Sequence, residues 1–249
     1  MRRPSQEELG LATALTDLAG ALQARRDVSA VCEEVVLAGA RFVPDAEDAV
    51  LSLAERKGMR TAAATGESAQ RMGALQYWCR QGPSIQAIDD GTPVRVDSLR
   101  HESRWPEFTR RVIQREGGSV LTLPLTVEGR AVGALMLWAR KDEAFDAVDE
   151  RIGTLMAAHA AVAVAGARER GHLRAALDSR DVIGQATGIL MERRRISAHE
   201  AFGLLSGASQ HMNRKLREVA ERLVWSGDFT EPHKRRGQRP AGGAAAGPH

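Results

Sequence analysis

Aromatic residues are scarce in this sequence, where five phenylalanines, four tryptophans and one tyrosine make up 4% of the 249 residues. Cysteine is scarcer still: Cys32 and Cys79 are too few to build a disulfide framework or a zinc site by themselves. The sequence also has no run of about 18 apolar residues and no apolar signal core behind its first residues. These absences argue against a disulfide scaffold and a membrane protein, and we expect a cytoplasmic location.

Motifs that carry catalysis are absent as well. The sequence contains no phosphate-binding glycine loop, no nucleophile elbow and no paired metal ligands. His101 falls in a polar loop and His159 in a predicted helix, and we interpret both as surface or packing residues rather than haem ligands. Both cysteines have apolar or amphipathic neighbours, as buried thiols commonly do. We therefore predict no enzyme activity and no metal site, and the sequence identifies no cofactor.

Net charge is low, at +3, so the whole chain is not strongly basic. The positive charge is unevenly distributed, because residues 168–225 carry eleven arginine and lysine residues against seven aspartate and glutamate residues. A local excess of this kind suits the binding of nucleic-acid phosphates. Solvated helix faces would account for the same residues.

Residues 6–165 alternate between the hydrophobic periodicities of helices and strands. Helical spacing covers two stretches within 6–41, then 67–81, 84–89 and the end of 98–116, and strand patterns cover 50–53, 59–64, 93–96, 119–127 and 130–139. We expect Asp27 to cap the second helix and turns at Lys57-Gly58 and Glu128-Gly129. This order of elements predicts an α+β domain.

One long helix is predicted from about residue 147 to about residue 192, with Asp146 as its N-cap. Its buried stripe is predicted to consist of Val148, Ile152, Leu155, His159 and Val162. Farther along, Leu173, Leu177 and Ile183 continue the helical spacing, and we predict that they form the seam of a parallel homodimer. Small residues in 157–167 would allow close helix pairing, although burial against the sheet would explain them equally well.

Two shorter helices are predicted after a turn at residues 193–195. Ser197 is a typical N-cap, and Glu200 three residues later completes a capping box. The buried side of this helix is predicted to consist of Ala201, Phe202, Leu204, Leu205 and Ala208. Gly207 is expected to loosen the helix, and Asn213 to cap the third helix.

Several short motifs occur in order in this region. They are IGQATGILM at 183–191, RRIS at 194–197, EAF at 200–202 and NRKLREVA at 213–220. With these motifs, residues 173–225 resemble the ANTAR domain, a three-helix RNA-binding module of bacterial transcription antitermination regulators. The resemblance implies binding to stem-loops in nascent leader transcripts, with RNA polymerase as a further partner.

The residue types that RNA binding requires are present in these motifs. Basic side chains neutralise phosphates, and amide or hydroxyl side chains hydrogen-bond exposed loop bases. The residues expected to bind RNA are Arg180, Gln185, Arg193, Arg194, Asn213, Arg214, Lys215 and Arg217. Family members often have basic residues where this sequence has Thr187, Ser206 and Gly207, so that charge is missing here.

Four further segments carry a second resemblance. They are GPSIQAIDDGTPVRVDSL at 82–99, SRWPEF at 103–108, GGSVLTLPLTVEGRAVGALMLWA at 117–139 and AFDAVD at 144–149. With them the region resembles a GAF domain of the kind found ahead of ANTAR domains. A GAF fold implies an antiparallel sheet flanked by helices, with a pocket for an unidentified small molecule. Arg104 and Trp105 either line that pocket or fix their loop against the sheet.

These patterns predict an N-terminal extension (1–14), a GAF sensor domain (15–165), an ANTAR RNA-binding domain (166–226) and a disordered tail (227–249). The favoured function is that of a homodimeric, signal-responsive antitermination regulator. One alternative is a DNA-binding regulator whose last two helices act as a helix-turn-helix. The other is a cysteine-dependent GAF enzyme, which needs a reactive thiol and a resolving partner. Relatives often have cysteine at the position of Ser84, and a thiol role there is excluded in this chain.

Overall fold

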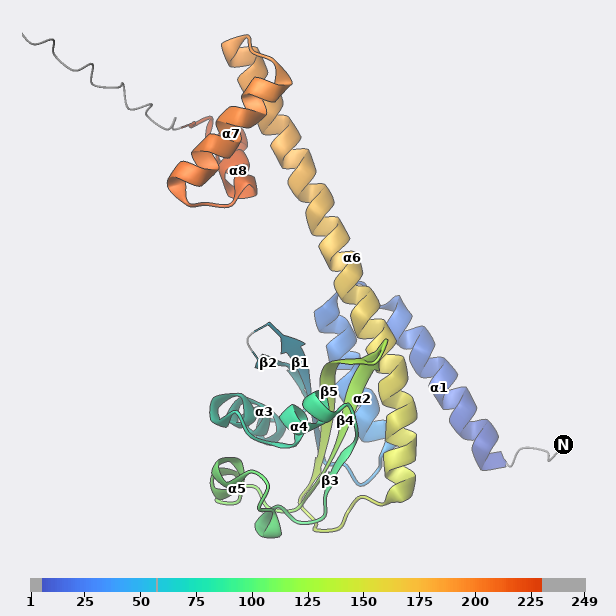
Figure 1. Cartoon of the computed structure of the whole chain (residues 1–249). Coiled ribbons are helices and arrows are strands. Elements are labelled where there is room, and N and C mark those ends of the chain that lie inside the picture. Colours follow the sequence, from blue (N-terminus) through green and yellow to red (C-terminus); the bar gives the residue numbers. More distant parts are fainter. Residues whose placement is uncertain (1–5, 57, 230–249) are drawn as a thin grey trace, which may run out of the picture. The chain divides into compact units, whose positions relative to one another are not determined.

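The computed structural model describes residues 6–56 and 58–229 (Figure 1). The predicted turn residue Lys57, the first five residues of the predicted extension 1–14 and most of the predicted tail 227–249 lie outside these ranges. Within them, none of the helices combines the length and the apolar character that a membrane span needs.

The first of two compact units, Met1–His172, is built on a five-stranded antiparallel sheet with the strand order β2-β1-β5-β4-β3 (Figure 1). The strands are β1 (Asp48–Glu55), β2 (Gly58–Ala64), β3 (Val94–Val96), β4 (Ser119–Val127) and β5 (Arg130–Ala139). The predicted hairpin is confirmed, because β4 and β5 are joined by Glu128 and Gly129. Both residues have positive φ angles, 50° and 76°, as a tight two-residue hairpin turn requires.

Helices cover both faces of this sheet (Figure 1). One face is covered by α1 (Gln6–Ala24), α2 (Val28–Phe42) and the first part of α6 (Ala147–Arg194). The other is covered by α3 (Glu67–Cys79), α4 (Pro83–Asp90) and α5 (Pro106–Val112), with a short 3-10 helix at Leu99–His101. The predicted cap of α2 is confirmed, since Asp27 Oδ1 accepts a hydrogen bond from Ala30 N at 2.9 Å. The α+β prediction is confirmed as well.

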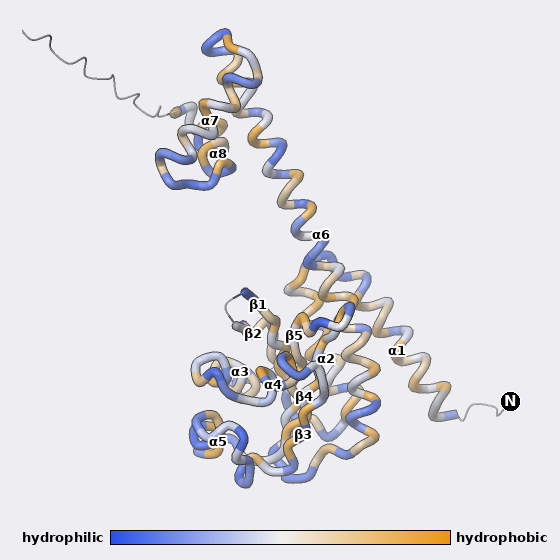
Figure 2. Tube along the Cα trace, viewed as in Figure 1, coloured by the Kyte–Doolittle hydropathy of each residue, from blue (hydrophilic) through white to orange (hydrophobic). Residues whose placement is uncertain are grey.

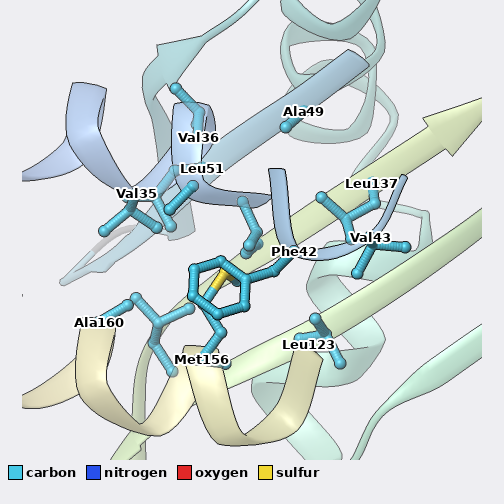
Figure 3. Packing of buried hydrophobic residues seen from close by; sticks show 14 of the residues in the cluster. Val35, Val36, Phe42, Val43, Ala49, Leu51, Leu123, Leu137, Met156 and Ala160 are labelled. Carbon is cyan, nitrogen blue, oxygen red and sulfur yellow. The ribbon is translucent and has the colours of Figure 1, made fainter. Parts of the chain in front are cut away.

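Successive side chains of a strand point to opposite faces of the sheet, so the apolar side chains of the strands are divided between two cores. Leu51 and Leu137 face α2 and α6, where Figure 3 shows the Phe42 ring beside Met156. Val50, one residue along β1, belongs to the core beneath α3, α4 and α5. Both faces of the strands are therefore apolar, and hydrophobic residues follow the strands in Figure 2.

The predicted buried stripe of α6 is wrong at four of its five positions. Val148, Leu155 and Val162 are 48%, 49% and 67% exposed, and His159 is exposed too, whereas Ile152 packs against the core. The face that meets the sheet consists of Met156, Ala157, Ala160, Ala161, Val164 and Ala167. Small residues occupy this face because the helix lies close to the strands. A Cβ atom on Gly153 would lie 2.5 Å from Cδ1 of Leu123.

Arg168 fixes α6 to the sheet near the end of the first unit. Its guanidinium donates a hydrogen bond to the carbonyl oxygen of Ala54 at 3.2 Å and a longer one to that of Val132 at 3.4 Å. Ala54 lies in β1 opposite Met59 of β2, and Val132 lies in β5. One side chain therefore connects the helix to two neighbouring strands.

The second compact unit, Leu173–His249, contains the end of α6 together with α7 (Ala198–Met212) and α8 (Leu216–Ser226). Its core consists of Ala186, Leu190, Ala201, Leu205, Ala208, Val219, Ala220 and Leu223. The predicted capping box is confirmed. Ser197 N donates to Glu200 Oε2 at 2.9 Å, and Glu200 N donates to Ser197 Oγ at 3.3 Å.

Two local predictions for this unit are wrong. Asn213 ends α7 in the left-handed conformation, with φ of 49°, and the N-cap of α8 is Lys215. Asparagine tolerates this conformation better than most residues, so it suits the end of a helix as well as the start. The second error concerns Gly207, where α7 continues without a break to Met212.

Candidate nucleic-acid interface and ligand pocket

Three consecutive exposed residues, Asn213, Arg214 and Lys215, connect α7 to α8. They form a hydrophilic segment in Figure 2. Ser209 holds this connection in place: its Oγ donates to the carbonyl oxygen of Arg214 at 2.6 Å, and Arg214 N donates to the carbonyl oxygen of Ser209 at 3.1 Å. The connection is thus a fixed turn that presents an amide and two cations to solvent.

The cations of this region differ in how they are paired. Arg214 binds Glu218 at 3.1 Å, and Arg217 binds Glu221 at 2.7 Å, each partner lying four residues on. Lys215 has no carboxylate partner among residues 6–56 and 58–229. Because pairing reduces the net charge that a phosphate meets, Lys215 is the strongest phosphate-binding candidate at this turn.

A shallow groove between α6 and α8 holds a second group of candidates. Gln185, Gly188 and Arg193 line it from α6, and Val224 lines it from α8. Arg193 Nη1 donates to the carbonyl oxygen of Gly227 at 2.7 Å, just beyond the end of α8. Gly188 has open space where a Cβ would lie, so a ligand backbone can approach closely. The structure therefore brings Gln185 and Arg193 together.

The remaining predicted RNA-binding residues, Arg180 and Arg194, do not line this groove. Arg180 is exposed on α6, and the Arg194 guanidinium lies 5.9 Å from the centroid of the Phe229 ring. Thr187 is half-buried and donates to the carbonyl oxygen of Ile183 at 2.7 Å. Thr187 therefore serves the helix itself and brings no charge to the surface.

Exposed aromatic side chains are the feature of this unit that sequence reasoning missed. Trp225, at the end of α8, is 86% exposed, and Phe202 on α7 is 47% exposed. The prediction that Phe202 is buried is therefore wrong. Trp225 could have been found, because it follows the buried Leu223 by two residues, about 200° around the helix. Exposed aromatic rings can stack on unpaired RNA bases.

The first unit contains a pocket of about 710 Å³ beside β2. Its lining residues come from β2, from α3 and the residue after it, and from α4: Gly58, Met59, Tyr77, Trp78, Arg80, Ile85, Ile88 and Asp89. A volume of this size falls in the usual range for small-molecule sites, about 300–1,000 Å³. The pocket combines apolar, aromatic and charged side chains.

Arg104 and Trp105 do not line this pocket. Trp105 is 6% exposed and meets Phe108 edge-to-face, with the ring centroids 6.4 Å apart. The Arg104 guanidinium lies 4.5 Å from the centroid of the Trp105 ring and 2.6 Å from Glu102. Burial alone would raise the pKa of Glu102, but hydrogen bonds from Arg104 hold it below its usual value. These contacts are those of residues that fix their loop against the sheet.

Neither cysteine has the surroundings of a reactive thiol. Burial raises the pKa of the Cys32 thiol to about 11, and burial also raises that of Cys79. A raised pKa lowers the fraction of thiolate, which is the reactive species, in both cysteines. In the described part of the chain, histidine, cysteine and carboxylate side chains form no cluster that could hold a metal ion.

The predicted dimer seam is partly open on α6. Leu173 and Leu177 are 60% and 61% exposed and lie four residues apart, on one side of the helix. Ile183 instead packs against the core that α6 shares with α7 and α8. The structure therefore leaves the first two residues available to a partner and commits the third to the bundle.

Comparison with known families assigns both parts of the chain. The model of the GAF domain matches residues 25–165, and the model of the ANTAR domain matches residues 171–224. No protein of curated function matches the chain significantly.

Solved structures similar to this chain include GAF domains of two phosphoenolpyruvate-protein phosphotransferases. The Acinetobacter domain is 14% identical and has a TM-score of 0.52, with 67% of this chain and 97% of that chain covered. For the Coxiella burnetii domain the identity is 17% and the TM-score 0.51, with coverages of 66% and 98%. A free methionine-R-sulfoxide reductase from Neisseria meningitidis, solved with its substrate, is 14% identical over 68% of this chain and 96% of that chain, with a TM-score of 0.50. Likeness at this level of identity establishes the fold alone.

Proposed function

Because this chain belongs to the GAF domain family and carries an ANTAR domain, we propose that it is a signal-responsive regulator of transcription antitermination. In this proposal residues 15–165 sense a small molecule, and residues 166–226 bind stem-loops in nascent leader transcripts in the cytoplasm. The observation that carries the proposal is the fixed turn at Asn213, Arg214 and Lys215, with exposed aromatic rings on the same small bundle.

In the proposed binding mode, basic side chains contact phosphates and aromatic side chains stack on bases. Lys215 and Arg193 contact phosphates, which determines affinity and makes binding sensitive to salt. Trp225 and Phe202 stack on unpaired loop bases, while the amides of Gln185 and Asn213 hydrogen-bond base edges. Single-stranded loops offer such bases, whereas a closed DNA duplex does not. The DNA-binding alternative is tested by adding unlabelled duplex DNA as a competitor.

Reversing the charge of Lys215 with Lys215→Glu is expected to weaken binding to stem-loop RNA about fivefold at 100 mM salt. It should also reduce the slope of log affinity against log salt by about 1, because one phosphate contact is lost. The free energy of unfolding should stay within about 0.5 kcal/mol of the unchanged protein, because the side chain is exposed. Fluorescence anisotropy with a labelled stem-loop across a salt series measures the affinity and the slope.

Two matched variants test whether the effect belongs to this turn. Lys141→Glu makes the same change at an exposed lysine of the first unit and should leave RNA affinity unchanged. Replacing Arg217 and Glu221 together by glutamine removes a neutral ion pair and should therefore weaken RNA binding less than Lys215→Glu. Equal losses from Lys141→Glu and Lys215→Glu would remove the turn from the interface. Full competition by duplex DNA would favour the alternative function.

The proposed active form is a homodimer that pairs along α6. Val148, Leu155 and Val162 are exposed at intervals of seven residues, and Leu173 and Leu177 are exposed farther along the same helix. Apolar residues at these spacings suit the pairing of two parallel helices. Two bundles held together can bind two RNA loops at once, which raises the effective affinity without any new contact.

Replacing Leu173 and Leu177 together by aspartate is expected to halve the mass that light scattering reports, because two charges would be buried in the seam. Leu37→Asp serves as the control, since Leu37 is also 60% exposed but lies on α2. Leu37→Asp should leave the mass unchanged. A monomeric wild-type protein, or a double variant that stays dimeric, would refute pairing through these leucines.

A further inference from the structure

Two charged side chains of the pocket beside β2 have no partner in the described part of the chain. Arg80, which follows α3, and Asp89, on α4, both line the pocket and are exposed. Within residues 6–56 and 58–229 neither side chain forms an ion pair or hydrogen bond, and the two do not pair with each other. The pocket therefore offers one free positive and one free negative group.

The inner surface of the pocket is apolar. Met59 is 5% exposed, and Ile85 and Ile88 on α4 are half-buried. Tyr77 and Trp78 on α3 complete the lining and are 56% and 65% exposed. Methionine adapts its shape to different apolar ligands, and aromatic rings add a large contact area. A ligand with an apolar body fits these surroundings.

The backbone at Arg80 allows the side chain to be removed without adding strain. Arg80 ends α3 in the left-handed conformation, with φ of 52°, which glycine adopts more easily. The backbone conformation therefore does not explain an arginine at this position. Glu128, Glu143, Arg195 and Asn213 also have positive φ and lie outside the pocket, so the conformation itself indicates no ligand and serves only the design of the variants.

The pair of charges restricts the class of ligand. Arg80 is the one cation among the described lining residues, and Asp89 would repel a polyanion such as a nucleotide. A fully apolar ligand would satisfy neither charge. We infer that the pocket binds a small zwitterion with an apolar body, of amino-acid to dipeptide size, whose carboxylate pairs with Arg80 and whose ammonium pairs with Asp89. This inference rests on the proposed sensor function and gives its signal a chemical class.

The inference is tested by titration calorimetry on the full chain without RNA. The probes are L-phenylalanine and the dipeptide L-phenylalanyl-L-leucine, each with an N-acetylated form that lacks the cation and a C-amidated form that lacks the anion. At least one zwitterion should bind about tenfold more tightly than both of its derivatives, because each derivative loses one charge-assisted contact.

Three variants assign the two charges. Arg80→Gln should weaken the zwitterion and the acetylated form about fivefold to tenfold and leave the amidated form unchanged. Asp89→Asn should show the reverse pattern. Arg80→Gly removes the side chain while relieving the left-handed backbone, so it should abolish the preference for a carboxylate without lowering the unfolding temperature. Arg26→Gln, at an exposed arginine outside the pocket, is the matched control.

Either of two results would overturn the inference: no zwitterion binds, or a derivative binds as tightly as its parent zwitterion. Binding that survives both Arg80→Gln and Asp89→Asn would also place the ligand elsewhere. The titration contains no RNA, so a negative titration would not affect the RNA-binding result with Lys215→Glu. A negative RNA-binding result would likewise not affect the titration.

Discussion

Replacing Gly118 by alanine is expected to lower the free energy of unfolding of the first unit by about 3 kcal/mol or more. Gly118 has φ of 87°, and a Cβ atom there would lie 1.9 Å from the carbonyl oxygen of Ala139 and 2.6 Å from the backbone of Arg140. These neighbours are backbone atoms at the end of β5, so they cannot rotate away as a side chain would. Circular dichroism during heating should show a midpoint lower by about 10 °C.

Gly129→Ala separates the cost of the steric clash from the cost of the left-handed backbone conformation. Gly129 also has a positive φ, 76°, but no heavy atom lies within 4 Å of the position that its Cβ would take. It should therefore show only the cost of the left-handed backbone, about 1 kcal/mol. Equal losses from the two variants would mean that the contact with β5 contributes nothing.

Trp225→Ala is expected to weaken binding to stem-loop RNA about tenfold, because stacking of one base on an aromatic ring contributes about 1–3 kcal/mol. The unfolding temperature should hardly change, since the side chain is 86% exposed. Fluorescence anisotropy with a labelled stem-loop measures the first effect, and circular dichroism the second.

Two control variants test whether the loss of affinity comes from this ring. Trp78→Ala, assayed without any ligand of the pocket, removes another exposed tryptophan, 65% exposed but in the first unit, and should leave RNA affinity unchanged. Leu223→Ala should destabilise the second unit by about 3 kcal/mol, because Leu223 is fully buried in its core. An RNA affinity that Trp225→Ala leaves intact would exclude stacking on this ring.

Local signals predicted the elements of this fold well. The Glu128-Gly129 turn and the capping box at Ser197 and Glu200 depend on residues close together in the chain, and both are confirmed. The buried face of α6 was predicted wrongly because its large apolar residues point outward. How near a helix lies to a sheet is a tertiary property, and hydrophobicity along one helix does not reveal it.

The candidate sites also combine features that local sequence predicts with features that depend on the tertiary structure. Sequence motifs indicated Arg214, Lys215 and Arg217 as RNA-binding candidates, but only the structure shows that Arg214 and Arg217 pair with Glu218 and Glu221. The resemblance to GAF domains implied a pocket, but the residues that line the pocket beside β2 were not predicted, because Met59, Arg80 and Asp89 lie far apart in the sequence and only the fold brings them together. For Arg104 and Trp105 the sequence left two alternatives, lining a pocket or fixing their loop, and the contacts in the structure are those of the second.

Arg168 connects the strand β1 to α6, the helix that continues into the second unit. Its guanidinium holds the carbonyl oxygen of Ala54, and Ala54 pairs with Met59 at the base of the pocket. If a bound ligand shifts this end of the sheet, it also shifts the Arg168 contact of α6, the helix that supplies Gln185 and Arg193. Thermodynamic linkage makes such coupling mutual, so bound transcript alters ligand affinity by the same factor by which ligand alters transcript affinity. The abundance of target RNA would then help to set the ligand concentration at which the regulator responds.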